Sequence, residues 1–147
     1  MGGAGAGWVA RFDPAGLALD SWTFAARPLA CLETGVLDAV ALALDSQGAL
    51  YVAYNLLEAG TAPSAWWTKF DRQGQPLWTL PLTGLFARHL AIGPGDRIYI
   101  ESIDRLHQFD TEGQAITEHR VPPLLVSSLR LWKDHFAILV EPVNVLE

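Results

Sequence analysis

Short segments in which apolar and polar residues alternate recur along the chain, and a turn motif follows several of them. The motif Phe-Asp-x-x-Gly occurs three times, at residues 12–16, 70–74 and 109–113. Aspartate at the start of such a turn accepts hydrogen bonds from nearby backbone amides, and glycine adopts the positive φ that closes the turn. Each copy therefore predicts a β-hairpin, and the aspartates of the motif are interpreted as turn residues: Asp13, Asp71 and Asp110.

A second kind of hairpin alternates with the first. An apolar triplet leads through a turn sequence into a strand rich in β-branched and aromatic residues, a pattern typical of β-hairpins. The copies span residues 42–53, 90–101 and 129–140. Asp45 is interpreted as a turn residue of the first copy. Tyr51 and Tyr99 occupy matched positions and are interpreted as structural residues.

The two hairpin types follow each other in strict order, so four strands make one unit. Four-stranded units of about 40–50 residues are the repeat of a β-propeller blade. The sequence therefore predicts an all-β chain that forms a propeller segment of about three blades. It comprises a flexible Gly/Ala lead-in and four groups of strands, namely residues 1–7 (lead-in), 8–24 (half blade), 39–80 (blade), 87–121 (blade) and 128–140 (half blade, in a region that runs to 147).

The paired signature is similar to the repeats of NHL-type and related bacterial β-propellers. Residues 42–53 carry the apolar strand, the Asp-x-x-Gly turn and Leu-Tyr-Val-Ala; residues 70–80 carry Phe-Asp-x-x-Gly and an aromatic strand. The resemblance covers the chain from about Trp8 to Val140. It implies the fold but hardly constrains the function, because such propellers serve as binding scaffolds, as sensor domains and occasionally as enzymes.

Three blades are too few to close a ring, because closed propellers have about four to eight blades. An incomplete ring leaves strand edges and apolar faces uncovered. The chain begins with the third and fourth strands of a blade and ends with the first and second. We therefore expect self-association into a homodimer with a six-bladed ring. The alternative is that this sequence is a fragment of a longer propeller chain.

Composition and charge exclude several classes of function. The net charge of −6 over 147 residues argues against a nucleic-acid partner. No apolar run reaches the roughly 18 residues that a membrane span needs. The start of the chain lacks the features of a signal peptide, and the localisation stays open. Cys31 is the one cysteine, which excludes an intrachain disulfide, and it is interpreted as a small apolar residue.

The connections opposite the hairpin turns include the longest loops, so they form the expected binding face. His89 lies at the start of a first strand, the strand nearest the centre of a propeller, and is the histidine expected to meet a ligand. No histidine or cysteine spacing indicates a metal, and no motif indicates a nucleotide or another cofactor. The candidate binding residues are Asn55, Glu58, Arg88, His89, Glu101 and Asp104.

The aromatic residues admit two interpretations. Tryptophans recur at repeated positions of third and fourth strands, which favours packing between blades, since each ring buries a large apolar area. The alternative is a platform on which sugars stack, and it requires rings exposed on the loop face. The residues concerned are Trp8, Trp22, Trp66, Trp67 and Trp78.

The function expected from these features is a non-catalytic scaffold that binds a protein, a peptide or a small ligand through its loop face or central channel. No residue is assigned as catalytic. One alternative is an enzyme of the hydrolase or lyase type, with Arg88, His89, Glu101 and Asp104 at the channel mouth. The other is an engineered or excised structural repeat array without a ligand.

Overall fold

The computed structural model describes most of the chain. Backbone is described for residues 6–25, 36–57, 60, 62, 64–83, 85–102, 104–120, 125–132 and 135–141. Side chains are described for the same residues except 6, 7, 23–25, 36–40 and 125–141. Cys31, Glu58 and the start of the lead-in lie outside the described residues.

Strands make up nearly all of the regular structure, which confirms the all-β prediction. The described residues contain one helical element, a 3-10 turn at Pro94–Asp96, and no helix long and apolar enough to cross a membrane. The strands are β1 (Ala6–Phe12), β2 (Ala18–Ala25), β3 (Val36–Leu44), β4 (Leu50–Leu57), β5 (Ser64–Phe70), β6 (Pro76–Leu82), β7 (His89–Gly93), β8 (Arg97–Glu101), β9 (Arg105–Phe109), β10 (Ala115–Arg120), β11 (Leu125–Trp132) and β12 (His135–Glu141).

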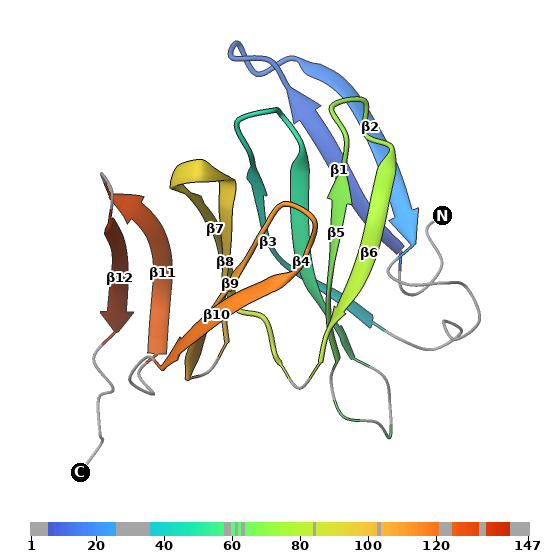
Figure 1. The fold of residues 1–147 in the computed structure, drawn as a ribbon. Helices are drawn as coiled ribbons and strands as arrows, with labels where there is room; N and C mark the ends of the chain where they lie inside the picture. The colour runs from blue at the N-terminus through green and yellow to red at the C-terminus, as the bar shows by residue number, and fades with distance from the viewer. Residues whose placement is uncertain are drawn as a thin grey trace.

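The strands form four antiparallel sheets in chain order. The first sheet is β1-β2, the second β3-β4-β5-β6, the third β7-β8-β9-β10 and the fourth β11-β12. Figure 1 shows the sheets in a row, with β1-β2 and β11-β12 on opposite flanks. The first strands of successive sheets are neighbours, since β3 contacts β7 and β7 contacts β11. No sheet closes on itself among the described strands.

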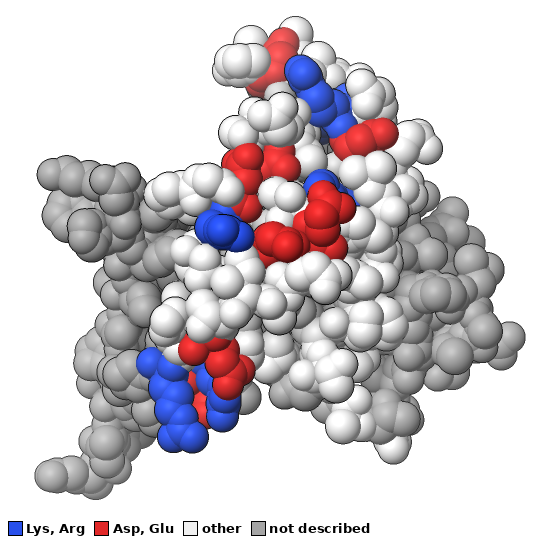
Figure 2. All heavy atoms as spheres, viewed as in Figure 1, with Lys and Arg blue, Asp and Glu red and all other residues white. Residues whose placement is uncertain are grey.

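The aspartates of the hairpin turns accept hydrogen bonds from backbone amides of the same turns, as the sequence predicts. Oδ1 of Asp71 accepts the backbone N–H of Gln73 and of Gln75, both at 2.9 Å, and Gly74 has a φ of +82°. Asp45 and Asp110 make the same pair of bonds in their own turns, and Asp13 makes one of them. These turns lie toward one end of the sheets, and Figure 2 shows carboxylates gathered over that end.

Neighbouring turns are tied to one another. The backbone N–H of Ser46 donates to Oδ1 of Asp96 at 2.8 Å, which joins the β3–β4 turn to the β7–β8 turn. Nζ of Lys69 donates to the carbonyl of Thr111 at 2.8 Å, which joins β5 to the β9–β10 turn. The second and third sheets are therefore held in a fixed relation at this end.

Apolar cores lie between successive sheets. Trp67 and Tyr51 of the second sheet pack against the third sheet, and the ring centroids of Trp67 and Phe109 are 4.8 Å apart. A second core joins the first and second sheets. There Trp22 meets Phe70 edge-on, with 5.9 Å between the ring centroids. The packing interpretation of the tryptophans is therefore confirmed for Trp22, Trp66, Trp67 and Trp78.

Trp8 is the exception to this packing. Its side chain is exposed, although Val9, the next residue of β1, is buried against the second sheet. Because successive side chains of a strand point to opposite faces, Trp8 lies on the face of β1 that points away from the second sheet. The interpretation of Trp8 as a packing residue is therefore wrong within this single chain.

Candidate functional site

Three of the six predicted binding residues meet at the end of β7 and β8 that lies away from the hairpin turns. His89 is the first residue of β7 and Glu101 the last of β8, and the antiparallel register places them directly opposite each other. Arg88 precedes β7, and its backbone N–H donates to the carbonyl of Glu101 at 2.9 Å. The strand pairing thus brings together residues that are 12 and 13 positions apart in the sequence.

His89 and Glu101 form a hydrogen-bonded pair. Nδ1 of His89 lies 2.9 Å from Oε2 of Glu101. The Glu101 side chain is fully buried, whereas 23% of the His89 side chain is exposed. The second carboxylate oxygen, Oε1 of Glu101, is also buried and has no hydrogen-bond partner among the described residues.

Asn55 positions this site from the neighbouring sheet. Its side-chain amide donates to the carbonyl of Ala87 at 2.8 Å, and its Oδ1 accepts the N–H of Ala87 at 2.9 Å. Both residues are buried. Because Ala87 lies directly before Arg88 and His89, the two bonds anchor the entrance of β7 to β4. Asn55 is therefore a positioning residue.

The remaining candidates do not join this group. Asp104 is exposed between β8 and β9, and its Oδ1 lies 3.8 Å from Nε of Arg105. Such an exposed ion pair contributes little to stability. Glu58, as noted, lies outside the described residues.

The His89–Glu101 pair has a defined chemistry. A carboxylate that accepts the Nδ1 proton fixes the imidazole tautomer, which leaves Nε2 as a hydrogen-bond acceptor. A buried acceptor without a partner costs about 1–3 kcal/mol. Oε1 of Glu101 is buried, so a molecule that approaches from solvent meets the exposed part of His89 rather than this oxygen. Arg88 adds a cation that makes no ion pair with another described residue.

A second group of polar residues lies on the outer strands of the third sheet, and the sequence reading missed it. Nε2 of His107 lies 3.4 Å from Oγ of Ser102, and Nδ1 lies 3.6 Å from Oε2 of Glu118. Glu118 also pairs with Arg105. The only signal in the sequence is the β9–β10 register, which sets Glu118 opposite His107.

This second group lacks the geometry of a nucleophilic site. The two distances exceed those of strong hydrogen bonds, and the Ser102 side chain is buried. His107 and Glu118 line a cavity of about 430 Å³ beside β6, whereas Ser102 does not. Burial is the main cause that lowers the pKa of His107 below its ordinary value of 6.5.

The described residues contain no cluster of three or more histidine, cysteine, aspartate or glutamate side chains that could hold a metal ion. The sequence matches no protein-family model and no curated protein.

Proposed function

We propose that this chain is a β-propeller segment of the NHL type that acts as a non-catalytic binding scaffold, self-assembled into a ring. Four-stranded antiparallel sheets in chain order support the propeller, as do the contacts of β3 with β7 and of β7 with β11. Blades around a common axis bring their first strands together in this way.

The observation that carries the binding role is the hydrogen-bonded pair of a fully buried Glu101 and a partly exposed His89. A carboxylate that holds the ring through Nδ1 leaves the other ring nitrogen, Nε2, able to meet a ligand. We assign the site to a protein, peptide or small ligand that presents a hydroxyl or ammonium donor to Nε2 of His89.

The alternative is an enzyme of the hydrolase or lyase type at the same place. A histidine held by a carboxylate is able to act as a general base. Binding is favoured over catalysis because the described residues of this group include no nucleophile, and because Asp104 pairs with Arg105.

The test uses thermal shifts with a panel of lysine-containing peptides and monosaccharides. A panel member that binds should raise the Tm of the wild type, and His89→Ala and Glu101→Gln should abolish the rise. His119→Ala, at an exposed histidine of β10, should retain it. Absence of any rise in the wild type, or a rise that persists in both site variants, would contradict the proposal. Hydrolysis of p-nitrophenyl acetate that depends on His89 would favour the enzyme.

A further inference from the structure

Equivalent residues of two neighbouring sheets differ sharply in burial. Leu42 of β3 pairs with Val52, and Leu90 of β7 pairs with Ile100, so the two leucines occupy the same position of the repeat. Leu90 is 5% exposed, whereas Leu42 is 60% exposed. Leu90 packs in the core against the complete second sheet. Leu42 points toward the first sheet, which has only two described strands.

The aromatic residue that begins each Phe-Asp-x-x-Gly turn shows the same contrast. Phe70 and Phe109 are buried at the ends of β5 and β9, each against the sheet before its own. Phe12 occupies the same position at the end of β1 and is 59% exposed. No sheet precedes the first one among the described residues. Apolar surface that the repeat is built to bury is thus left uncovered.

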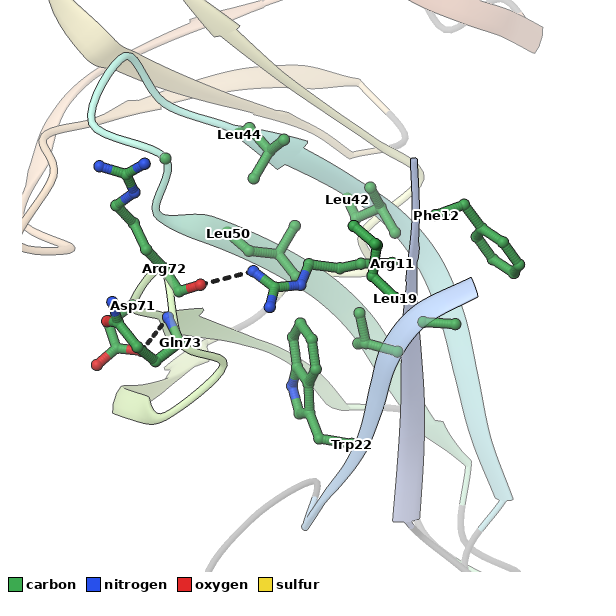
Figure 3. A pocket seen from close by; sticks show the side chains of 13 residues that line it. Arg11, Phe12, Leu19, Trp22, Leu42, Leu44, Leu50, Asp71, Arg72 and Gln73 are labelled. Atoms are coloured by element: carbon green, nitrogen blue, oxygen red, sulfur yellow. Dashed lines mark hydrogen bonds between the residues drawn. The ribbon is translucent and has the colours of Figure 1, made fainter. Parts of the chain in front are cut away.

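These surfaces border a cavity between the first and second sheets. It has a volume of about 560 Å³, and its lining includes Phe12, Leu19, Leu42 and Leu44. Figure 3 shows Leu42 and Leu44 on β3 facing the cavity across from the first sheet, with Arg11 reaching over to the carbonyl of Arg72. Among the described strands, the first sheet lacks, on the β3 side of β1, the two inner strands that the second and third sheets each have.

Two of the described strands, β1 and β12, lack a neighbour that their counterparts in the repeat have, and the two are complementary. β5 and β9 each pair on both sides, whereas β1, which has the same place in the repeat, pairs with β2 alone. Likewise β4 and β8 pair on both sides, whereas β12 pairs with β11 alone. An unpaired edge exposes a row of backbone donors and acceptors that a further strand can satisfy.

We propose that the β11-β12 hairpin of a second copy adds to the free edge of β1 and covers Leu42 and Leu44, and that a reciprocal contact closes a ring of two chains. This proposal rests on the propeller architecture proposed above and specifies which strands join the two copies into a closed ring. The mixed sheet would have the order β11-β12-β1-β2, which matches the second and third sheets. Each of its two halves would come from a different copy.

The occupant is a second copy rather than the same chain. Figure 1 shows β11-β12 on the opposite flank of the row from β1-β2, with β11 beside β7. Closing one chain on itself would require a ring of three blades, below the number that propellers use. Two copies supply six, with both ends matched.

The repeat fixes the register of the new strand pair. The bulge of β3 lies at Val40 and that of β11 at Ser127. Four residues after each bulge stand Leu44, which pairs with Leu50, and Leu131, which pairs with Phe136. Phe136 is therefore equivalent to Leu50. In the second and third sheets, the residue at this position pairs with the phenylalanine of the Phe-Asp-x-x-Gly motif. Leu50 pairs with Phe70, and Ile98 pairs with Phe109.

Phe136 of the second copy is therefore expected opposite Phe12, because Phe12 is equivalent to Phe70 and Phe109. Counting along the antiparallel strands places Ile138 opposite Ala10. This pair is suited to a crosslink, because opposed residues of antiparallel strands have Cβ atoms about 4.5–5.5 Å apart.

Cysteine crosslinking tests this register. The chain with Cys31→Ser, Ala10→Cys and Ile138→Cys is oxidised with copper phenanthroline at micromolar concentration and run on a non-reducing gel. We expect a covalent dimer in which both junctions are linked. The matched control replaces Ile138→Cys by Ala137→Cys, which moves one cysteine to the opposite face of the strand. It should crosslink at least tenfold more slowly.

Each other result overturns the proposal. A monomer with an internal disulfide would show that the chain closes on itself, and a ladder of higher species would show open polymers. No crosslink, together with a monomeric mass by light scattering, would show that no second copy pairs with the edge of β1, and would favour a fragment of a longer chain.

A second pair of variants does not depend on engineered cysteines. Leu42→Glu places a charge on the surface to be covered, and Leu77→Glu places one on a similarly exposed leucine of β6 outside it. We expect light scattering to show loss of the dimer for Leu42→Glu and its retention for Leu77→Glu. Equal masses for both variants would contradict the proposal. Ligand binding at His89 is measured separately, so failure of the assembly leaves the binding role to be judged by its own test.

Discussion

Single residues at the hairpin turns show how closely the repeated sheets are fitted together. Gly16 and Gly113 have the same place in the Phe-Asp-x-x-Gly turn and nearly the same φ, +85° and +81°. A Cβ on Gly16 would meet no described atom within 4 Å, whereas one on Gly113 would collide with Cδ1 of Leu80. The local turn is the same, and only the neighbouring sheet differs.

Gly113→Ala is therefore expected to destabilise the fold more than Gly16→Ala. A left-handed conformation costs an L-residue about 1–2 kcal/mol, so Gly16→Ala should lower the free energy of unfolding by about that amount. Gly113→Ala should lower it further, because the Leu80 side chain must also shift to make room for the new Cβ. Urea unfolding followed by tryptophan fluorescence measures both. Equal losses would show that the β9–β10 turn does not approach β6 so closely.

His107 carries the pH dependence argued at this scale. Burial lowers its pKa below the ordinary 6.5, so the unfolded chain binds a proton more readily than the folded one. The contribution of His107 to stability is thus fully present above pH 6.5 and is lost as the pH falls through the lowered folded-state pKa. Unfolding measured from about pH 8 to pH 5 should show a decline that is smaller in His107→Gln. An NMR titration midpoint of His107 above its ordinary pKa of 6.5 would contradict this.

At the scale of the elements, the sequence predicts the hairpins well because their signals are local. Asp71 and Gly74 specify a turn within one short motif, and alternation specifies the strands on each side. The His89–Glu101 pair needs one step more, the register of β7 with β8, which follows from the turn between them. The exposure of Trp8 depends on whether another sheet lies against β1. No pattern within the strand contains that information.

The Ser102–His107–Glu118 group and the role of Asn55 could not be predicted from local sequence patterns. Glu118 meets His107 only because a bulge between Ala115 and Thr117 shifts the strand pairing. Asn55 reads as a ligand-binding residue in a loop, yet it lies in β4 and bonds the backbone of Ala87 in the next sheet. Contacts between sheets follow from packing geometry, which periodicity does not encode.

Asn55→Ala tests how the second sheet holds the third. The substitution leaves the buried N–H and carbonyl of Ala87 without partners, each at a cost of about 1–3 kcal/mol. We expect lower stability, faster hydrogen exchange at the Ala87 amide and weaker ligand binding at His89. Asn55→Asp retains the acceptor and should protect that amide better than Asn55→Ala does. Unchanged exchange in Asn55→Ala would show that the clamp does not position β7.

At the scale of the whole molecule, the junction between the second and third sheets is well packed, whereas the first sheet and β3 leave apolar side chains exposed. The second and third sheets share an aromatic core and tied turns, whereas Leu42, Leu44, Phe12 and Trp8 leave apolar surface exposed near an edge that no described strand pairs. Large exposed apolar patches mark interaction sites. Assembly and stability should therefore be linked in this protein.

That linkage predicts that thermal stability rises with protein concentration. If two chains complete each other, mass action adds about 1.4 kcal/mol per mole of dimer for each tenfold increase in concentration. The Tm of the wild type, measured by calorimetry over a roughly hundredfold range, should climb steadily, because unfolding releases two chains from one ring. Leu42→Glu should show a lower and concentration-independent Tm, while Leu77→Glu should follow the wild type. A constant Tm in the wild type would mean that the exposed leucines and the edge of β1 are stable without a second copy, and the ring would then need another source for its missing strands.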